Sequence, residues 1–152
     1  MKVVVTGAGR GIGQRLAEVI KNHEVTAIVR FLDAICVEDS NPTYIPYSDR
    51  ANVELSIKDS DCVIHCALDT KSPRKESFQQ NLDLNKHILE QSLEGKCELF
   101  VYFSSQAVYS GIDQIDDLGY YEEQACISYD KSNDYTGLDH GIGHFIGSLP
   151  RR

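Results

Sequence analysis

Short apolar runs alternate with stretches of helical periodicity along the chain as far as residue 104. Residues 3–5 are consecutive valines, whose branched side chains suit a buried strand. From Ile12 to Ile20 apolar residues recur every three or four positions, as they do along one face of a helix. The pattern predicts strands at residues 3–5, 24–30, 43–47, 61–67 and 98–104, and helices at 12–20, at 52–58 and from Pro73 to about Gly95.

This alternation predicts a parallel sheet covered by helices, with right-handed crossovers, which is a doubly wound α/β fold of the Rossmann type. The length of 152 residues suits one domain. We expect residues 111–152 to form a poorly defined tail, in which the apolar residues at 138–149 still have the spacing of a helix although glycines interrupt it. The core stripe predicted for the long helix is Phe78, Leu82, Asn85, Leu89 and Leu93.

A glycine-rich turn between the first strand and the first helix carries the strongest chemical signal. Glycines permit a tight turn and the close approach of a pyrophosphate, and the N-terminus of the following helix favours an anion. Ile12 occupies the place of the third glycine in Gly-x-Gly-x-x-Gly, so that fingerprint is not met. The pattern Thr-Gly-x-x-x-Gly-x-Gly is present and resembles the short-chain dehydrogenase/reductase superfamily. The predicted cofactor site comprises Thr6, Gly7, Gly9, Arg10, Gly11, Ile12 and Gly13.

Two arginines bear on the choice of cofactor. In a doubly wound fold, the residue that ends the second strand meets the adenosine ribose, where an acid selects NAD and an arginine suits the 2′-phosphate of NADP. Arg30 occupies this position, and Arg10 lies in the glycine turn. Guanidinium groups make charge-assisted bonds to a phosphate. We therefore expect NADP, with NAD as the alternative, although both arginines could also be ordinary solvated side chains.

Composition narrows the classes of partner and the compartment. The formal charge is −8 and no basic run occurs, which argues against nucleic acid or an anionic membrane as partner. No apolar stretch approaches the ~20 residues that span a bilayer. The N-terminus carries no signal-peptide pattern, and five cysteines without Cys-x-x-Cys spacing indicate free thiols. We expect a cytoplasmic protein.

Several segments in the right order resemble the NAD-dependent epimerase/dehydratase family, whose members act mainly on nucleotide sugars. The segment Asp-Cys-Val-Ile-His-Cys-Ala at 61–67 is similar to the family's Asp-x-Val-Ile-His-x-Ala strand. Asn81 is similar to its helix asparagine, and residues 100–109 contain Ser-Ser-x-x-Val-Tyr. The resemblance covers residues 1 to about 110. His65, within the first of these segments, is better interpreted as a core histidine than as a catalyst.

The resemblance assigns roles to residues outside the glycine turn. It implies that Asp49 approaches the adenine and that Ala67 and Leu68 line the pyrophosphate and ribose site. It also implies that Asn81 contributes to the cofactor site and that Ser105 holds the reacting hydroxyl of the substrate. The alternatives are a solvated acid for Asp49, a helix-face amide for Asn81 and a hydroxyl bonded to backbone for Ser105.

The catalytic tyrosine of the family presents a difficulty. Tyrosine is a poor base at neutral pH unless a lysine four residues later lowers its pKa, which gives the signature Tyr-x-x-x-Lys. Tyr129 is followed at that distance by Asn133, and Tyr135 is followed by Asp139. We favour Tyr135, because the apolar stripe after it continues as a helix. An aspartate there would raise the tyrosine pKa, and an asparagine would give no electrostatic help.

The family members run to about twice this length, so we expect an incomplete fold without the C-terminal substrate lobe. Three hypotheses remain open: a shortened and impaired enzyme, a dinucleotide-binding or sensor module without turnover, and a truncated product without function. We expect pairing with a second copy through helices at 74–94 and about 134–149. His140 and His144 are spaced for zinc, but two solvated histidines are the better interpretation, and we expect no metal.

Overall fold

The computed structural model describes residues 1–32, 41–69 and 74–103 of the chain. The chain divides into two compact units. The first unit comprises residues 1–69 and 84–103, and the second comprises residues 70–83 and 104–152. Within the described residues the elements are β1 (Lys2–Thr6), α1 (Gly11–Val19), β2 (Glu24–Val29), β3 (Thr43–Pro46), α2 (Arg50–Lys58), β4 (Cys62–His65), α3 (Arg74–Glu94) and β5 (Leu99–Tyr102).

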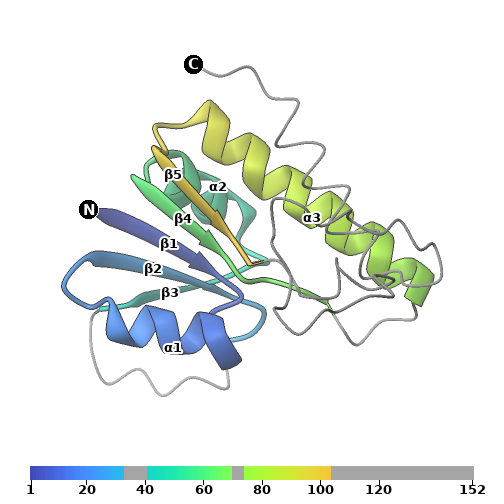
Figure 1. The fold of residues 1–152 in the computed structure, drawn as a ribbon, viewed down its shortest axis with the longest axis horizontal. Coiled ribbons are helices and arrows are strands. Elements are labelled where there is room, and N and C mark those ends of the chain that lie inside the picture. Colours follow the sequence, from blue (N-terminus) through green and yellow to red (C-terminus); the bar gives the residue numbers. More distant parts are fainter. Residues whose placement is uncertain (33–40, 70–73, 104–152) are drawn as a thin grey trace, which may run out of the picture. The chain divides into compact units, whose positions relative to one another are not determined.

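All strands of the first unit join one parallel sheet in the order β3-β2-β1-β4-β5 (Figure 1). β1 lies at the centre, where Val4 is opposite Thr26 of β2 and Val63 of β4. β3 is an edge strand of the described sheet, so Pro46, which has no N–H to donate, is tolerated at its end. The predicted Rossmann-like sheet is confirmed, and each predicted strand matches an observed one to within about two residues at either end.

Helices cover both faces of this sheet, which is therefore doubly wound. Residues that alternate along a strand face opposite sides. Val3 and Val5 face α1, where they pack with Ala17, and Val4 faces the other side, where it packs with Ile57 of α2. Ile88, from the part of α3 in the first unit, completes that second core, together with Ile28, Val53 and Val63.

The buried face of α1 differs from the apolar periodicity of its sequence. Ile12 and Val19 are 62% and 60% exposed, whereas Gly13 and Ala17 are buried. A Cβ on Gly13 would lie 2.6 Å from the carbonyl oxygen of Gly7, so the helix begins too close to β1 for a larger side chain. Small residues therefore form the part of this face that lies closest to the sheet, and of the large residues Ile20, at the end of the helix, packs against this core while Ile12 and Val19 remain exposed.

The stripe predicted for α3 was also wrong toward its C-terminal end. Leu93 is 38% exposed, whereas Ile88, Leu89 and Ser92 are buried. The Ser92 hydroxyl donates to the Ile88 carbonyl at 2.8 Å, which satisfies it inside the helix. Asn85 is buried as predicted. A hydroxyl bonded within its own helix can thus occupy a core position that a search for apolar residues does not find.

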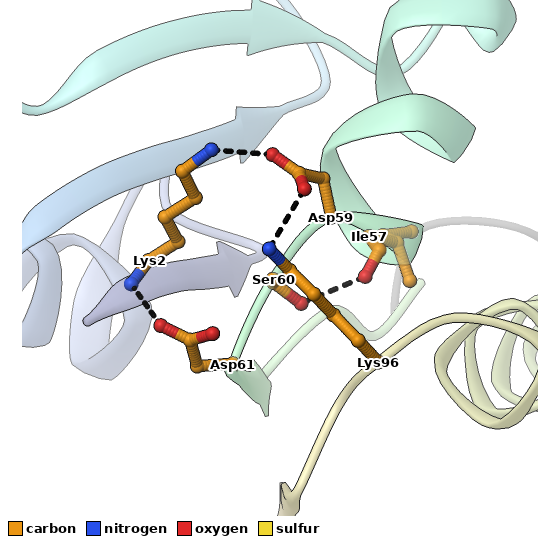
Figure 2. Close-up of polar contacts among 6 residues, drawn as sticks. All are labelled: Lys2, Ile57, Asp59, Ser60, Asp61 and Lys96. Atoms are coloured by element: carbon orange, nitrogen blue, oxygen red, sulfur yellow. Dashed lines mark hydrogen bonds and ion pairs between the residues drawn. The ribbon is translucent and has the colours of Figure 1, made fainter.

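The amino end of the sheet is held by an ion-pair cluster (Figure 2). The ammonium groups of Lys2 and Lys96 lie 2.5 and 2.8 Å from the two carboxylate oxygens of Asp59. The Asp61 carboxylate accepts from the Lys2 backbone N–H at 2.8 Å. Hydrogen bonds from Lys2 and then from Lys96 lower the pKa of Asp59 to about 2. The cluster therefore joins the start of β1 to the loops that precede β4 and β5.

Candidate functional site

The glycine turn lies at the carboxyl end of the sheet, where the strand order reverses. β1 is flanked by β2 on one side and by β4 on the other, so the turn after β1 and the segment after β4 leave the sheet side by side. The Cys66 N–H donates to the Thr6 carbonyl at 3.2 Å, which extends this pairing by one residue. In open α/β sheets, ligands bind outside the carboxyl ends of the strands at such a reversal.

Two glycines permit the close packing of this turn. Gly7 has φ +70°, and a Cβ there would lie 2.7 Å from the backbone nitrogen of Ala67. A Cβ on Gly13 would lie 2.6 Å from the Gly7 carbonyl oxygen, which is a similarly close contact. The turn, the start of α1 and the segment after β4 are therefore in backbone contact, and no larger residue fits at Gly7 without a backbone shift.

The start of α1 has no capping side chain. Arg10 precedes the helix without a side-chain cap, and no acid lies in the first turn. Gly11 has φ +62°, and a Cβ there would meet nothing within 4 Å. Arg10, Gly11 and Ile12 are all exposed. Since the first N–H groups of a helix have no intrahelical acceptors, this arrangement fits a pyrophosphate.

Helix α2 has the opposite arrangement at its N-terminus. Asp49 caps it by accepting from the Asn52 N–H at 3.4 Å and from the Asn52 side-chain amide at 2.7 Å. The carboxylate that was predicted to approach an adenine thus has a structural role in this conformation. α1 has no such capping side chain, which leaves its end open to a ligand.

A buried hydrogen-bonded chain supports the turn from beneath. His65 is 1% exposed, and its Nδ1 and Nε2 lie 2.5 Å from Thr6 Oγ1 and 2.6 Å from Asn85 Oδ1. Burial lowers the pKa of His65 to about 4, so the ring is neutral at pH 7. Nε2 then donates to the amide oxygen and Nδ1 accepts from the Thr6 hydroxyl, which itself accepts from the Ala67 N–H at 3.3 Å. The prediction of a core histidine is confirmed.

This hydrogen-bonded network gives Thr6 a role that the sequence did not indicate. Its hydroxyl is 61 positions away from Ala67 along the chain and fixes that residue's backbone against the glycine turn. Asn85 was predicted only as part of the core stripe, and its bond to His65 links α3 to the same network. Nothing in the local pattern distinguishes these partners, because they meet only when the sheet forms.

Arg30 makes an ion pair that the sequence did not indicate. Its guanidinium Nη2 lies 3.0 Å from Oδ1 of Asp69, and the two side chains are 54% and 10% exposed. Arg30 follows β2 and Asp69 follows β4, with β1 between these strands. The ion pair therefore joins the segments that follow β2 and β4, while the arginine side chain stays partly exposed to solvent.

The remaining predicted site residues are placed as follows. Gly9 makes only ordinary contact, since a Cβ there would lie 3.8 Å from Val29. Leu68 is half-buried. Asn81, in the second unit, is buried, and its amide donates to the Ser77 hydroxyl at 3.2 Å. Ser105, Tyr129, Tyr135, His140 and His144 lie outside the described residues.

Cys66 is the thiol that follows β4 at this edge of the sheet. Burial raises the pKa of the Cys66 thiol to about 11, so it stays protonated at neutral pH. Cys62, Cys66 and Cys97 are free thiols, as predicted. Within residues 1–32, 41–69 and 74–103, no group of three potential metal ligands occurs and no helix is long and apolar enough to cross a membrane.

A family model described as the NAD-dependent epimerase/dehydratase family matches residues 3–136 of this chain. The chain belongs to that family. The match begins in β1 and extends through every described element, so the predicted resemblance is confirmed for the fold and the family. No curated protein sequence matches the chain.

Solved structures show the same fold at low identity. UDP-glucuronic acid 4-epimerase from Bacillus cereus, in complex with NAD, is 21% identical with a TM-score of 0.74 over 97% of this chain and 52% of its own. The NDP-hexosamine 5,6-dehydratase TunA of tunicamycin biosynthesis is 22% identical with a TM-score of 0.73, over 100% and 51%. A short-chain dehydrogenase/reductase superfamily protein from Agrobacterium tumefaciens with bound NAD is 15% identical with a TM-score of 0.74, over 95% and 43%. The chain thus spans about half the length of these structures.

Proposed function

We propose that the first unit binds a dinucleotide across the carboxyl ends of β1, β2 and β4. The observation that carries this proposal is the backbone contact of Gly7 with Ala67, next to the uncapped start of α1. The N–H groups at the start of α1 would hold the pyrophosphate, and the Thr6–His65 network would keep the Ala67 segment in place.

NADP is the cofactor that this site suits better. Arg30 stands where the adenosine ribose is expected, in place of an acid, and Arg10 lies exposed beside the helix start. A 2′-phosphate would form charge-assisted bonds with these guanidinium groups that a neutral hydroxyl cannot form. NAD, which two of the structural relatives contain, is the alternative.

A nucleotide sugar is the substrate class we propose, by membership of the family. A bound nicotinamide supplies a hydride acceptor for the oxidation of a sugar alcohol. Ser105 would hold the reacting hydroxyl, and Tyr135 or Tyr129 would remove its proton. Neither tyrosine is followed by lysine four residues later, so its pKa is not lowered in this way and turnover is expected to be slow. The same feature favours a second candidate, a dinucleotide-binding module without turnover.

The binding proposal is tested by a substitution that leaves the fold intact. Ile12 is 62% exposed in the first turn of α1, so Ile12→Asp adds a carboxylate where it stabilises the helix but repels a pyrophosphate. Titration with NADPH followed by fluorescence should show micromolar binding to the wild type and at least tenfold weaker binding to the variant. Val19→Asp, at the exposed far end of the same helix, is the matched control and should bind as the wild type does. Equal binding by both variants would contradict the proposed site.

Turnover separates the two candidate functions. Purified protein would be incubated with NADP or NAD and a panel of UDP-sugars, with products followed by proton NMR. Conversion that stops in Ser105→Ala, and in either Tyr135→Phe or Tyr129→Phe, supports the enzyme. Cofactor binding without conversion of any sugar supports the binding module. We further propose a cytoplasmic protein that pairs with a second copy through α3 and the helix expected at about 134–149, which light scattering at high concentration would test.

A further inference from the structure

The Arg30–Asp69 ion pair lies across the predicted path of the cofactor. β2 and β4 are separated by β1, so their ends are two strand spacings apart, or about 9.6 Å. The arginine side chain nevertheless comes within 3.0 Å of the Asp69 carboxylate. The ion pair therefore brings the segments that leave β2 and β4 together at the carboxyl edge of the sheet, on either side of the strand from which the glycine turn begins.

The two partners differ in their access to solvent. The Arg30 side chain is 54% exposed, whereas that of Asp69 is 10% exposed. The carboxylate is thus held in place, and the long arginine remains free to contact a ligand with its other N–H groups. Arg30 is also one of the two arginines on which the proposed preference for a 2′-phosphate depends, so a partner that holds this guanidinium affects that preference.

We propose that Asp69 is a specificity-determining residue, which competes with the cofactor's 2′-phosphate for Arg30 and so limits the preference for NADP over NAD. This inference rests on the proposed function. A 2′-phosphate that reaches Arg30 must either displace Asp69 or lie near its negative charge, and both weaken binding. NAD carries a hydroxyl at this position and leaves the ion pair intact. Asp69 thus selects against NADP, although Arg30 selects for it.

The test is a double-mutant cycle on cofactor affinity. Asp69→Asn removes the charge at constant size and should tighten NADPH binding about three- to tenfold. This magnitude is expected because the interaction free energy of a partly exposed ion pair lies at or above the range usual for surface pairs. NADH affinity should change less than about twofold. Arg30→Gln should reduce the NADPH preference, and Asp69→Asn should have little further effect on the NADPH to NADH affinity ratio in the Arg30→Gln background, because the proposed competition is for Arg30.

Asp59→Asn provides the matched control. It removes the same charge and also breaks an ion pair, but it lies in the cluster at the amino end of the sheet (Figure 2). Its NADPH to NADH affinity ratio should equal that of the wild type. Asp69→Ser removes the carboxylate with a smaller side chain and should reproduce the shift of Asp69→Asn, and thermal melts in the absence of cofactor show which variants are folded.

Two kinds of failure are distinguishable. Wild-type protein that binds neither cofactor overturns the proposed function and the inference with it. Cofactor binding with an unchanged affinity ratio in Asp69→Asn and Asp69→Ser overturns the inference alone. The same holds if Asp59→Asn shifts the ratio equally, or if Asp69→Asn still tightens NADPH in the Arg30→Gln background.

Discussion

Substitution of Gly7 by alanine tests the packing of the glycine turn directly. The added Cβ would lie 2.7 and 2.8 Å from the nitrogen and Cα of Ala67, and 2.8 Å from the carbonyl carbon of Cys66. All three are backbone atoms, so no side-chain rotation relieves the contacts. Gly7 also has φ +70°, which an L-residue adopts only with strain.

The magnitude follows from these two effects. A left-handed backbone costs an L-residue about 1–2 kcal/mol. Overpacking against atoms that cannot rotate away costs typically about 1–3 kcal/mol. We therefore expect Gly7→Ala to lower the free energy of unfolding by about 2–5 kcal/mol, a large part of the ~5–15 kcal/mol available to a natural domain.

Two neighbouring glycines separate the contributions. Gly11 has φ +62° with nothing within 4 Å of an added Cβ, so Gly11→Ala should cost only the strain, about 1–2 kcal/mol. Gly13 has no positive φ, so Gly13→Ala should carry no backbone strain, but the added Cβ would lie 2.6 Å from the Gly7 carbonyl oxygen. The higher helix propensity of alanine, ~1 kcal/mol above that of glycine, should offset part of the cost of that contact.

Urea unfolding followed by far-UV circular dichroism suits a chain without tryptophan. Gly7→Ala should give the largest loss of the three variants, with an unchanged dependence of the unfolding free energy on urea. A loss no larger than that of Gly11→Ala would refute the backbone contact between the turn and Ala67.

Three further predictions concern the core and its charges. Burial lowers the pKa of His65 to about 4, so between pH 6.5 and 4 the unfolded state binds more protons than the folded state. The free energy of unfolding should therefore fall by up to about 3 kcal/mol as the pH is lowered across that window. His65→Gln should flatten this part of the stability–pH profile, and an unchanged profile would contradict the neutral buried ring. The pKa of Asp59 is lowered to about 2, so its ion pairs stabilise the fold above about pH 4. Asp59→Asn should therefore be less stable than the wild type at neutral pH, and this difference should disappear as the pH falls toward 2. A difference that persists at pH 2 would point to another cause. Ile88→Ala should cost about 2–5 kcal/mol and Leu93→Ala less than about 1 kcal/mol in urea unfolding, whereas the reverse order would restore the stripe that the sequence predicted for α3.

The sheet could be predicted from the sequence because its strands are short apolar runs. The three valines in β1 and the apolar run in β4 are stable only when buried in a core. The helical segments between the strands act as crossover connections, which give parallel pairing. The glycine turn could also be predicted from the sequence, because Gly7 and Gly11 adopt the positive φ angles that the turn requires. These features depend on local chemistry, which a sequence displays.

The helix faces and the side-chain partners of the site could not be predicted in this way. Ile12 and Val19 suggested an apolar face, but both are exposed, and the close approach at Gly13 excludes a large side chain from the sheet side of the first turn of α1. Arg30 and Asp69 are 39 positions apart and meet only because β2 and β4 flank the same strand. Apolar periodicity contains no information about such distances.

An NMR titration of the labelled protein with NADPH tests the central claim, that the carboxyl end of the sheet binds a dinucleotide. The backbone amides of residues 7–13, of Arg30 and of residues 67–69 should shift as NADPH is added. The amides around Lys2, Asp59 and Lys96, at the amino end, should not move. An unchanged spectrum, or shifts confined to the amino end, would contradict the account.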